Sequence, residues 1–216
     1  MRDRAIQSQA QGALAVARHV IEAVERGRPA DAALAARFRA HRHYGSRDRR
    51  FFGTVLFAYF RWKGWLDGIA DLPQALAAAC WLDGQDGFPA LAQWGDRPPT
   101  LLPDTALPDL ASRFGEWQGT PPPPIEALVP AWMLADIPDD GAPDFTLRFL
   151  TALQQRPPLW LRARQGQRDA VLAHLAAHGI HAGSDPRLPD AVRVDSAPSA
   201  SVLGPLLHRH AEIQDI

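Results

Sequence analysis

The front of the sequence is rich in arginine, whose guanidinium group is well suited to bind phosphate. Up to Leu66 there are twelve Arg and one Lys against five acidic residues, whereas the remainder holds ten basic and nineteen acidic residues. The planar fork of arginine binds two phosphate oxygens at once, and such contacts supply most non-specific affinity for nucleic acids. The net charge of -1 therefore hides a basic front, which indicates either a polyanionic partner or a solvated surface.

The basic residues gather around one turn, His-Arg-His-Tyr-Gly-Ser at residues 41–46. In and around it we expect six RNA-binding residues: Arg37, Arg42, Arg47, Arg50, Arg61 and Lys63. Phosphate contacts are expected from four of them, Arg42, Arg47, Arg50 and Arg61. His43 and Tyr44 are suited to stack on a base of a single-stranded segment. A second basic patch is expected much later in the chain, at Arg162 and Arg164. The sequence thus predicts an RNA-binding surface that contains aromatic rings.

Some charges near the turn have a competing structural role. On a helical wheel, Arg49 lies nearer the apolar flank of its helix, so we expect it to stabilise packing. Asp48 and neighbouring acids are expected to pair with some of the arginines. Such ion pairs would fix helix packing instead of leaving guanidinium groups open to a ligand.

Residues that commonly carry catalysis or bind metals are scarce or badly placed. The sequence contains neither a GxxxxGK[ST] loop nor a GxGxxG loop, and no Ser-His-Asp arrangement stands out. Cys80, the single cysteine, excludes a cysteine-based zinc site, and its apolar neighbours favour a packing role. The His-Arg-His stretches at 41–43 and 208–210 favour a polar surface or RNA contact over a metal site. The acids of turn 83–87 lack the EF-hand register, and Asp139–Asp140 has the context of an exposed loop. We expect no catalytic, metal or cofactor site.

Helices must position the basic residues. Apolar residues at helical spacing predict helices over 6–24 and 31–42, and a buried helix over 73–82. Another is predicted from Ser46, its expected N-cap, to Leu66. Its apolar face comprises Phe51, Phe52, Val55, Leu56, Tyr59, Trp62 and Leu66. The opposite stripe comprises Arg47, Arg50, Thr54 and Arg61. One helix therefore presents a core face and a row of guanidinium groups.

The pattern changes where the prolines begin. Seventeen of the twenty prolines follow Arg97, and residues 97–124 are expected to form an extended connector with at most short helical pieces. Short helices are predicted over 130–137 and 144–154. The next elements are predicted as strands over 159–164, 180–182, 191–194 and 210–214, with helices over 169–178 and 201–207.

These elements predict a mainly α fold class, in which a helical bundle over residues 1–140 is followed by a small α/β unit over 141–216. The bundle includes the Pro-rich connector near 97–124. No apolar run approaches the roughly 18 residues of a membrane span, and the first residues lack a signal-like apolar core. We therefore expect a cytoplasmic protein without a membrane partner, and the single cysteine agrees with that compartment.

Two stretches together resemble a known family. Residues 41–61, His-Arg-His-Tyr-Gly-Ser-Arg-Asp-Arg-Arg-Phe-Phe-Gly-Thr-Val-Leu-Phe-Ala-Tyr-Phe-Arg, resemble the signature of a NusB-like helical domain. That domain opens bacterial ribosomal RNA cytosine methyltransferases of the RsmB/Sun (Fmu) type. Arg-Pro-Pro-Leu-Trp-Leu-Arg at 156–162, the helix after it and Ala-Glu-Ile-Gln-Asp at 211–215 resemble the small α/β (RRM-like) subdomain before that family's catalytic domain. Where the family usually has Asn, this chain has Arg164.

The resemblance implies a parent enzyme that transfers a methyl group from S-adenosylmethionine to carbon 5 of a cytosine in small-subunit ribosomal RNA. In that family one cysteine attacks the base and a second helps to release the product, and Cys80 matches neither position. Those cysteines lie in a Rossmann-like domain that would follow Gln214–Asp215. We expect this chain to be the RNA-binding, substrate-positioning portion. A truncated front portion is favoured over a stand-alone relative that lost its catalytic part.

Two other functions remain open. NusB-like domains also bind protein partners, so the chain is alternatively a protein-interaction or antitermination-type module. The salt dependence of binding distinguishes RNA from a protein partner, because binding to phosphates weakens steeply with salt and binding through an apolar interface does not. An enzyme with an unrecognised site has little support, since no nucleophile, metal cluster or phosphate loop is visible.

Overall fold

The computed structural model describes residues 2–85, 87–95, 105–137, 141–155, 157–195 and 198–214. The chain divides into two compact units, Met1–Gln154 and Gln155–Ile216, which we call the helical unit and the sheet unit. The boundary predicted from the sequence is at 140–141. Several residues considered above lie outside the described part of the chain: Asp86, Arg97 to Asp104, Asp139, Asp140, Arg156, the His208 side chain, Asp215 and Ile216.

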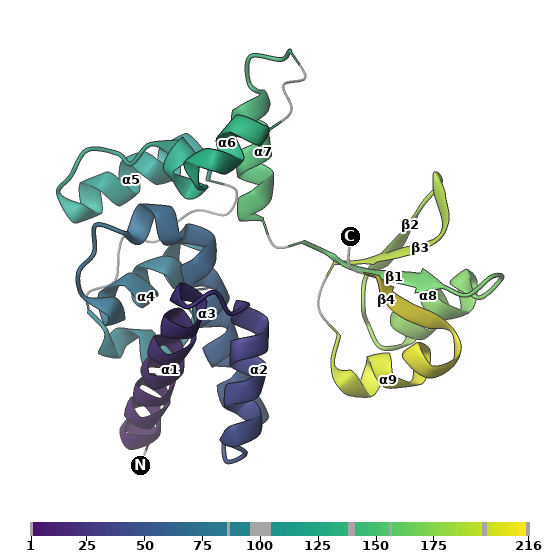
Figure 1. Cartoon of the computed structure of the whole chain (residues 1–216). Helices are drawn as coiled ribbons and strands as arrows, with labels where there is room; N and C mark the ends of the chain where they lie inside the picture. The colour runs from purple at the N-terminus through teal and green to yellow at the C-terminus, as the bar shows by residue number, and fades with distance from the viewer. Residues whose placement is uncertain are drawn as a thin grey trace. The chain divides into compact units, whose positions relative to one another are not determined.

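All regular secondary structure in the described part of the helical unit is helical (Figure 1). Its α-helices are α1 (Arg2–Glu25), α2 (Ala30–Ala40), α3 (Ser46–Leu66), α4 (Leu72–Leu82), α5 (Leu107–Gln118), α6 (Ala131–Asp136) and α7 (Phe145–Gln154). Two 3-10 helices, η1 (Pro89–Gln93) and η2 (Ile125–Leu128), lie between them. The six helices predicted in this part of the chain are confirmed to within two residues at each end, except for the start of α1.

The third helix, α3, is the central element of the helical unit. It packs against α1, α4 and η2 and buries Phe51, Leu56 and Trp65. The Trp65 indole N–H donates to the Pro124 carbonyl oxygen at 2.9 Å, which ties α3 to the Pro-rich segment. Gly64 allows the backbone of η2 to approach, since a Cβ there would overlap the Ala127 carbonyl. The predicted apolar face of this helix is confirmed, although Tyr59 is only half-buried.

Two predictions about local structure are wrong. The expected connector contains α5, a twelve-residue helix that buries Leu107, Leu110 and Phe114. Pro108 is tolerated in its first turn, and Gly119 ends it in the left-handed conformation, so these residues punctuate a helix instead of preventing one. At the start of α3, the N-cap is Gly45 and not Ser46, because the Gly45 carbonyl already accepts the first helical hydrogen bond.

The sheet unit has the chain order β-α-β-β-α-β. Its elements are β1 (Leu159–Ala163), α8 (Arg168–Ala177), β2 (Ala182–Asp185), β3 (Leu188–Val194), α9 (Ala200–Arg209) and β4 (Ala211–Gln214). The strands pair antiparallel in the order β2-β3-β1-β4. This is the ferredoxin-like, or RRM-like, arrangement. The predicted fold class, a helical bundle followed by a small α/β unit, is confirmed.

Alternation along the strands decides which face of this sheet is buried. Leu161, Val192 and Val194 are fully buried and belong to one core with Val171 of α8 and Leu206 of α9. Since successive side chains of a strand point to opposite faces, the residues between them form a second face that these helices do not cover.

The described part of the chain contains no helix with both the length and the apolar character needed to cross a membrane. Nor do its described histidines, cysteines and acids include a group of three that could hold a metal ion.

Candidate nucleic-acid interface

The turn between α2 and α3 is fixed by aromatic packing. The Tyr44 ring is half-buried and lies edge-on to Phe52, with ring centres 5.0 Å apart, and it also contacts Phe38 at 6.4 Å. His43 is exposed and lies 4.3 Å from Tyr44. Of the two rings predicted to stack on a base, Tyr44 therefore anchors the turn and His43 faces solvent.

Arg49 links this turn to the first turns of α3. Its Nε donates to the Tyr44 carbonyl oxygen at 2.9 Å, and its guanidinium carbon lies 5.6 Å from the centre of the Phe38 ring. Both contacts hold the end of α2 against the start of α3. The prediction that Arg49 is structural is confirmed.

The carboxylate of Asp48 has a partner other than the one predicted. Its Oδ1 accepts a hydrogen bond from Gln9 Nε2 of α1 at 2.9 Å. Among the described residues it makes no ion pair with an arginine. Asp48 therefore joins α1 to α3.

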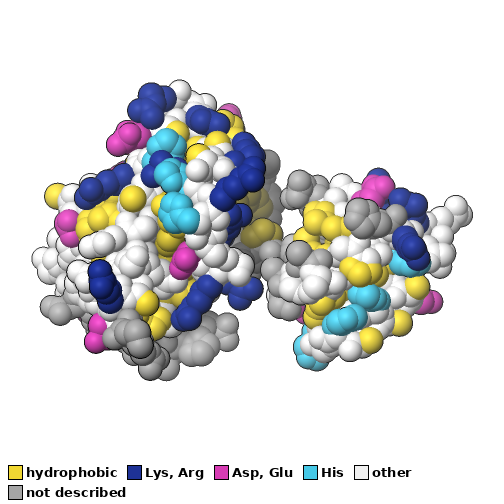
Figure 2. All heavy atoms as spheres, turned by 90° about the horizontal axis from the view of Figure 1, so that it is seen from below, with side chains coloured by type: hydrophobic (Ala, Val, Ile, Leu, Met, Phe, Trp, Pro, Cys, Tyr) yellow, Lys and Arg dark blue, Asp and Glu magenta, His cyan; other side chains and the backbone are white. Residues whose placement is uncertain are grey.

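Four of the predicted RNA-binding residues have no carboxylate within ion-pair distance in the part of the chain that the structure describes: Arg37, Arg42, Arg47 and Arg50. We call them the arginine cluster. Arg42, Arg47 and Arg50 are exposed. Arg37 is half-buried, and its Nε is enclosed without a hydrogen-bond partner among the described residues. In Figure 2, histidine side chains of the helical unit lie together with lysine and arginine side chains on both sides.

The electrostatics of this surface favour an anion. Burial lowers the pKa of His41 from its ordinary value of 6.5, and the charge of Arg37 and the nearby His43 and His19 lower it further. The part of this shift that comes from Arg37, His43 and His19 reflects basic neighbours around the ring, whereas the larger part comes from burial. The first turn of α3 also lacks a side-chain cap, so its backbone N–H groups and the positive end of the helix dipole add to the attraction. Phosphate is the anion that this combination of groups suits best.

Two predicted ligands, Arg61 and Lys63, have carboxylate partners instead. Arg61 forms an ion pair with Asp83, and their side chains are only 16% and 2% exposed. Asp83 also accepts a 3.4 Å hydrogen bond from the Trp62 indole, so the group joins α3 to the end of α4. Lys63 Nζ lies 2.6 Å from Asp67 Oδ1, and that hydrogen bond raises the pKa of Lys63. The geometry gives Arg61 a packing role and leaves it outside the arginine cluster.

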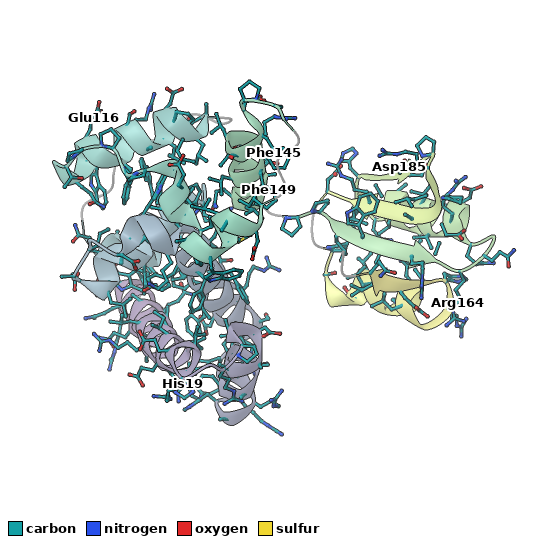
Figure 3. All side chains as sticks on the ribbon, turned by 45° about the horizontal axis from the view of Figure 1, so that its top comes forward. His19, Glu116, Phe145, Phe149, Arg164 and Asp185 are labelled. Atoms are coloured by element: carbon teal, nitrogen blue, oxygen red, sulfur yellow. The ribbon has the colours of Figure 1, made fainter. Side chains whose placement is uncertain are left out.

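The second predicted patch lies at β1 of the sheet unit. Arg162 Nη2 is 2.8 Å from Glu212 Oε2 of β4, and this hydrogen bond lowers the pKa of Glu212. Arg164 follows the end of β1, where its backbone N–H donates to the His210 carbonyl oxygen at 2.8 Å. Its side chain is exposed, at the end of the sheet unit away from Asp185 (Figure 3). Both arginines thus remain accessible, and one is paired.

Trp160 and Arg193 of the sheet unit are not among the residues predicted to bind RNA. These residues are direct partners in the β1–β3 register, and both point away from the helices. Alternation within Leu-Trp-Leu-Arg was a signal for Trp160, since it places Trp160 on the same face as Arg162. The pairing with Arg193 could not be predicted because it depends on a strand 33 positions later.

Neither unit offers a fit for S-adenosylmethionine, the cofactor that the family resemblance implies. Nucleotide-like cofactors bind where parallel strands end at a glycine-rich loop and a helix N-terminus. All strands described here are antiparallel, and the loop after β1 carries a single glycine, Gly166.

Comparison with known proteins identifies one segment. Residues 129–201 match the family described as the ferredoxin-like domain of RsmF/B-like methyltransferases. The resemblance to the RsmB/Sun type is thereby confirmed for this segment, which begins before α6 and ends in α9. The crystal structure of PH0851 matches with a TM-score of 0.49 and 15% identity, over 92% of this chain and 52% of that one. The chain thus spans about half the length of that structure. No curated protein sequence matches it.

Proposed function

We propose that this chain, which resembles the RsmF/B-like methyltransferases over residues 129–201, binds small-subunit ribosomal RNA and positions it for methylation at carbon 5 of a cytosine. The observation that carries the proposal is the arginine cluster beside the exposed ring of His43. Guanidinium groups without carboxylate partners are open to phosphates, and an exposed ring is open to an unstacked base.

Arg162 and Arg164 extend the proposed RNA contacts to the sheet unit. The pair between Arg162 and Glu212 is exposed, with 63% and 54% of the two side chains accessible, so it contributes little stability and competes weakly with phosphate. We assign the methyl donor, S-adenosylmethionine, to a catalytic domain outside this chain. The helical unit is proposed to act as a NusB-like module, and the protein to work in the cytoplasm where ribosomal RNA is modified.

The test removes the arginine cluster without disturbing the fold. The variant R42A/R47A/R50A loses three exposed guanidinium groups, and R26A/R113A/R148A removes the same charge elsewhere in the helical unit. Affinity for a small-subunit ribosomal RNA fragment is measured across a salt series. We expect the first variant to flatten the log-log salt slope by about 0.7 for each lost contact, or roughly 2 in all. The control should keep the wild-type slope, and equal slopes for all three proteins would contradict the proposal.

A protein partner is the second candidate, favoured by one observation. Trp132 of α6 is 69% exposed, and Leu147 and Leu153 of α7 are also exposed. Aromatic anchors of this kind dominate many protein interfaces. If a protein bound through this surface, W132A would abolish its binding, and salt would change the affinity little, whereas RNA binding would be unaffected.

A further inference from the structure

The uncovered face of the sheet unit carries a tryptophan at its centre. The strand register places Gly183, Arg193, Trp160 and Gln214 in one row across all four strands, from β2 to β4. Their side chains point away from α8 and α9, because neighbours such as Leu161 are buried in the core on the other face. Trp160 is itself only half-buried. A large flat ring thus lies on a central strand, on the face that α8 and α9 leave uncovered.

Hollows lie on both sides of this ring. A cavity of about 710 Å³ extends from Trp160 toward Arg193 and the β2–β3 turn, and one of about 320 Å³ extends along Arg162 and Ala191. Gly183 keeps the row open, since a Cβ there would meet no atom within 4 Å. The first cavity is also lined by Asp185 and Asp195, so its walls are polar as well as apolar.

Guanidinium groups flank the ring on the same face. Arg193 pairs with Asp195 through its Nε at 3.0 Å, a contact that uses one of the five N–H donors of the guanidinium group. Arg162 lies two residues from Trp160 and therefore on the same side of the sheet. Both arginines are more than half exposed, and exposed ion pairs of this kind contribute little to stability. A phosphate on either side of a stacked base would find a cation within reach.

We propose that the face around Trp160 is a stacking platform for an unpaired base of single-stranded RNA, with Arg162 and Arg193 beside it for the adjoining phosphates. RRM domains, which share this topology, bind single strands by stacking bases on aromatic rings of the open face. This inference rests on the proposed RNA binding and adds a base contact to it. The site lies in a different unit from the arginine cluster, and it acts through an aromatic ring instead of net charge.

The experiment measures the affinity of the full chain for an oligouridine hexamer and for an abasic hexamer that keeps only ribose and phosphate. W160A is expected to weaken binding of oligouridine about tenfold, in line with the loss of one stacked base. W160F keeps a flat ring and should retain most of the affinity. W132A removes the more exposed Trp132 of α6 and should change nothing. The abasic hexamer should bind wild type and W160A equally.

Salt separates failure of the platform from failure of RNA binding itself. Stacking releases no counterions, so W160A should lower affinity by the same factor at every salt concentration and leave the slope unchanged. If wild type binds RNA but W160A binds it equally well, the platform is wrong and the proposed function stands. If wild type binds no RNA, both are wrong. If W160A changes self-association in sedimentation and leaves RNA affinity unaltered, the face is a protein interface, which also overturns the platform.

Discussion

Arg47 and Arg61 lie on the same side of α3, about four turns apart, yet their surroundings differ. Arg61 pairs with a carboxylate that is almost completely buried, whereas Arg47 is exposed and has no ion pair with any described residue. Helical spacing predicted the stripe on which both lie. It could not predict the pairing, because Asp83 is 22 positions away and reaches Arg61 only through the packing of α3 on α4. Residue type thus indicated candidates, and tertiary contacts decided which of them are open to a ligand.

The ion pair between Arg61 and Asp83 should contribute to stability and not to RNA binding. We expect D83A to lower the free energy of unfolding by about 3 kcal/mol, because it leaves the Arg61 charge largely enclosed without a partner. K63A should cost no more than about 0.5 kcal/mol, since its pair with Asp67 is an exposed i,i+4 contact. Urea unfolding measures both. A D83A protein as stable as wild type would show that the pair is not formed.

His41 offers an internal probe of bound phosphate. Its pKa is lowered in the free protein, so the neutral form is favoured at pH 7, and protonation should reduce stability as the pH falls below 6.5. Phosphates at the arginine cluster would favour the charged ring, so RNA should raise the pKa of His41 and bind more tightly at pH 6 than at pH 7. NMR titration of the histidine signals with and without RNA checks this. An unchanged pKa at saturating RNA would place the phosphates elsewhere.

At the scale of elements, hydrophobic periodicity predicted most of the helices and strands, whereas the proline content led to one wrong prediction. The helices of the basic front and the order of elements in the sheet unit followed from spacing alone. The helix α5 was missed because prolines dominate its neighbourhood, although Leu107, Leu110 and Phe114 recur at helical spacing within it. Proline excludes a helix interior but favours a first turn, so its position matters more than its number. The sheet register, in contrast, required the structure.

Replacing either of two glycines of α3 with alanine should have opposite effects on stability. In G64A, the new methyl group would overlap the Ala127 carbonyl of η2, so we expect a loss of about 3 kcal/mol or more as the helix separates from η2. In G53A, a Cβ meets nothing within 4 Å, and the better helix propensity of alanine should add up to about 1 kcal/mol. Thermal unfolding of both variants tests the α3–η2 packing. Similar effects of the two substitutions would contradict it.

Across the whole molecule, basic and aromatic groups are distributed between two separately folded units. The helical unit supplies guanidinium groups without carboxylate partners in the described residues, and the sheet unit supplies an open face with a central tryptophan. The charge asymmetry between the two halves of the sequence was evident from composition. It indicated a polyanionic partner but not which residues would contact that partner. The matched segment, residues 129–201, includes helices of the first unit as well as most of the second.

The measurement closest to the central claim is binding of the unmodified chain to a small-subunit ribosomal RNA fragment and to a scrambled RNA of equal length, across a salt series. We predict preference for the ribosomal fragment and a log-log slope of about -3 to -4, as four to six phosphate contacts require. The absence of binding at low salt would contradict it and would mean that the arginine cluster serves the fold or a protein partner. Equal affinity for both RNAs would contradict the proposed positioning of a particular ribosomal segment.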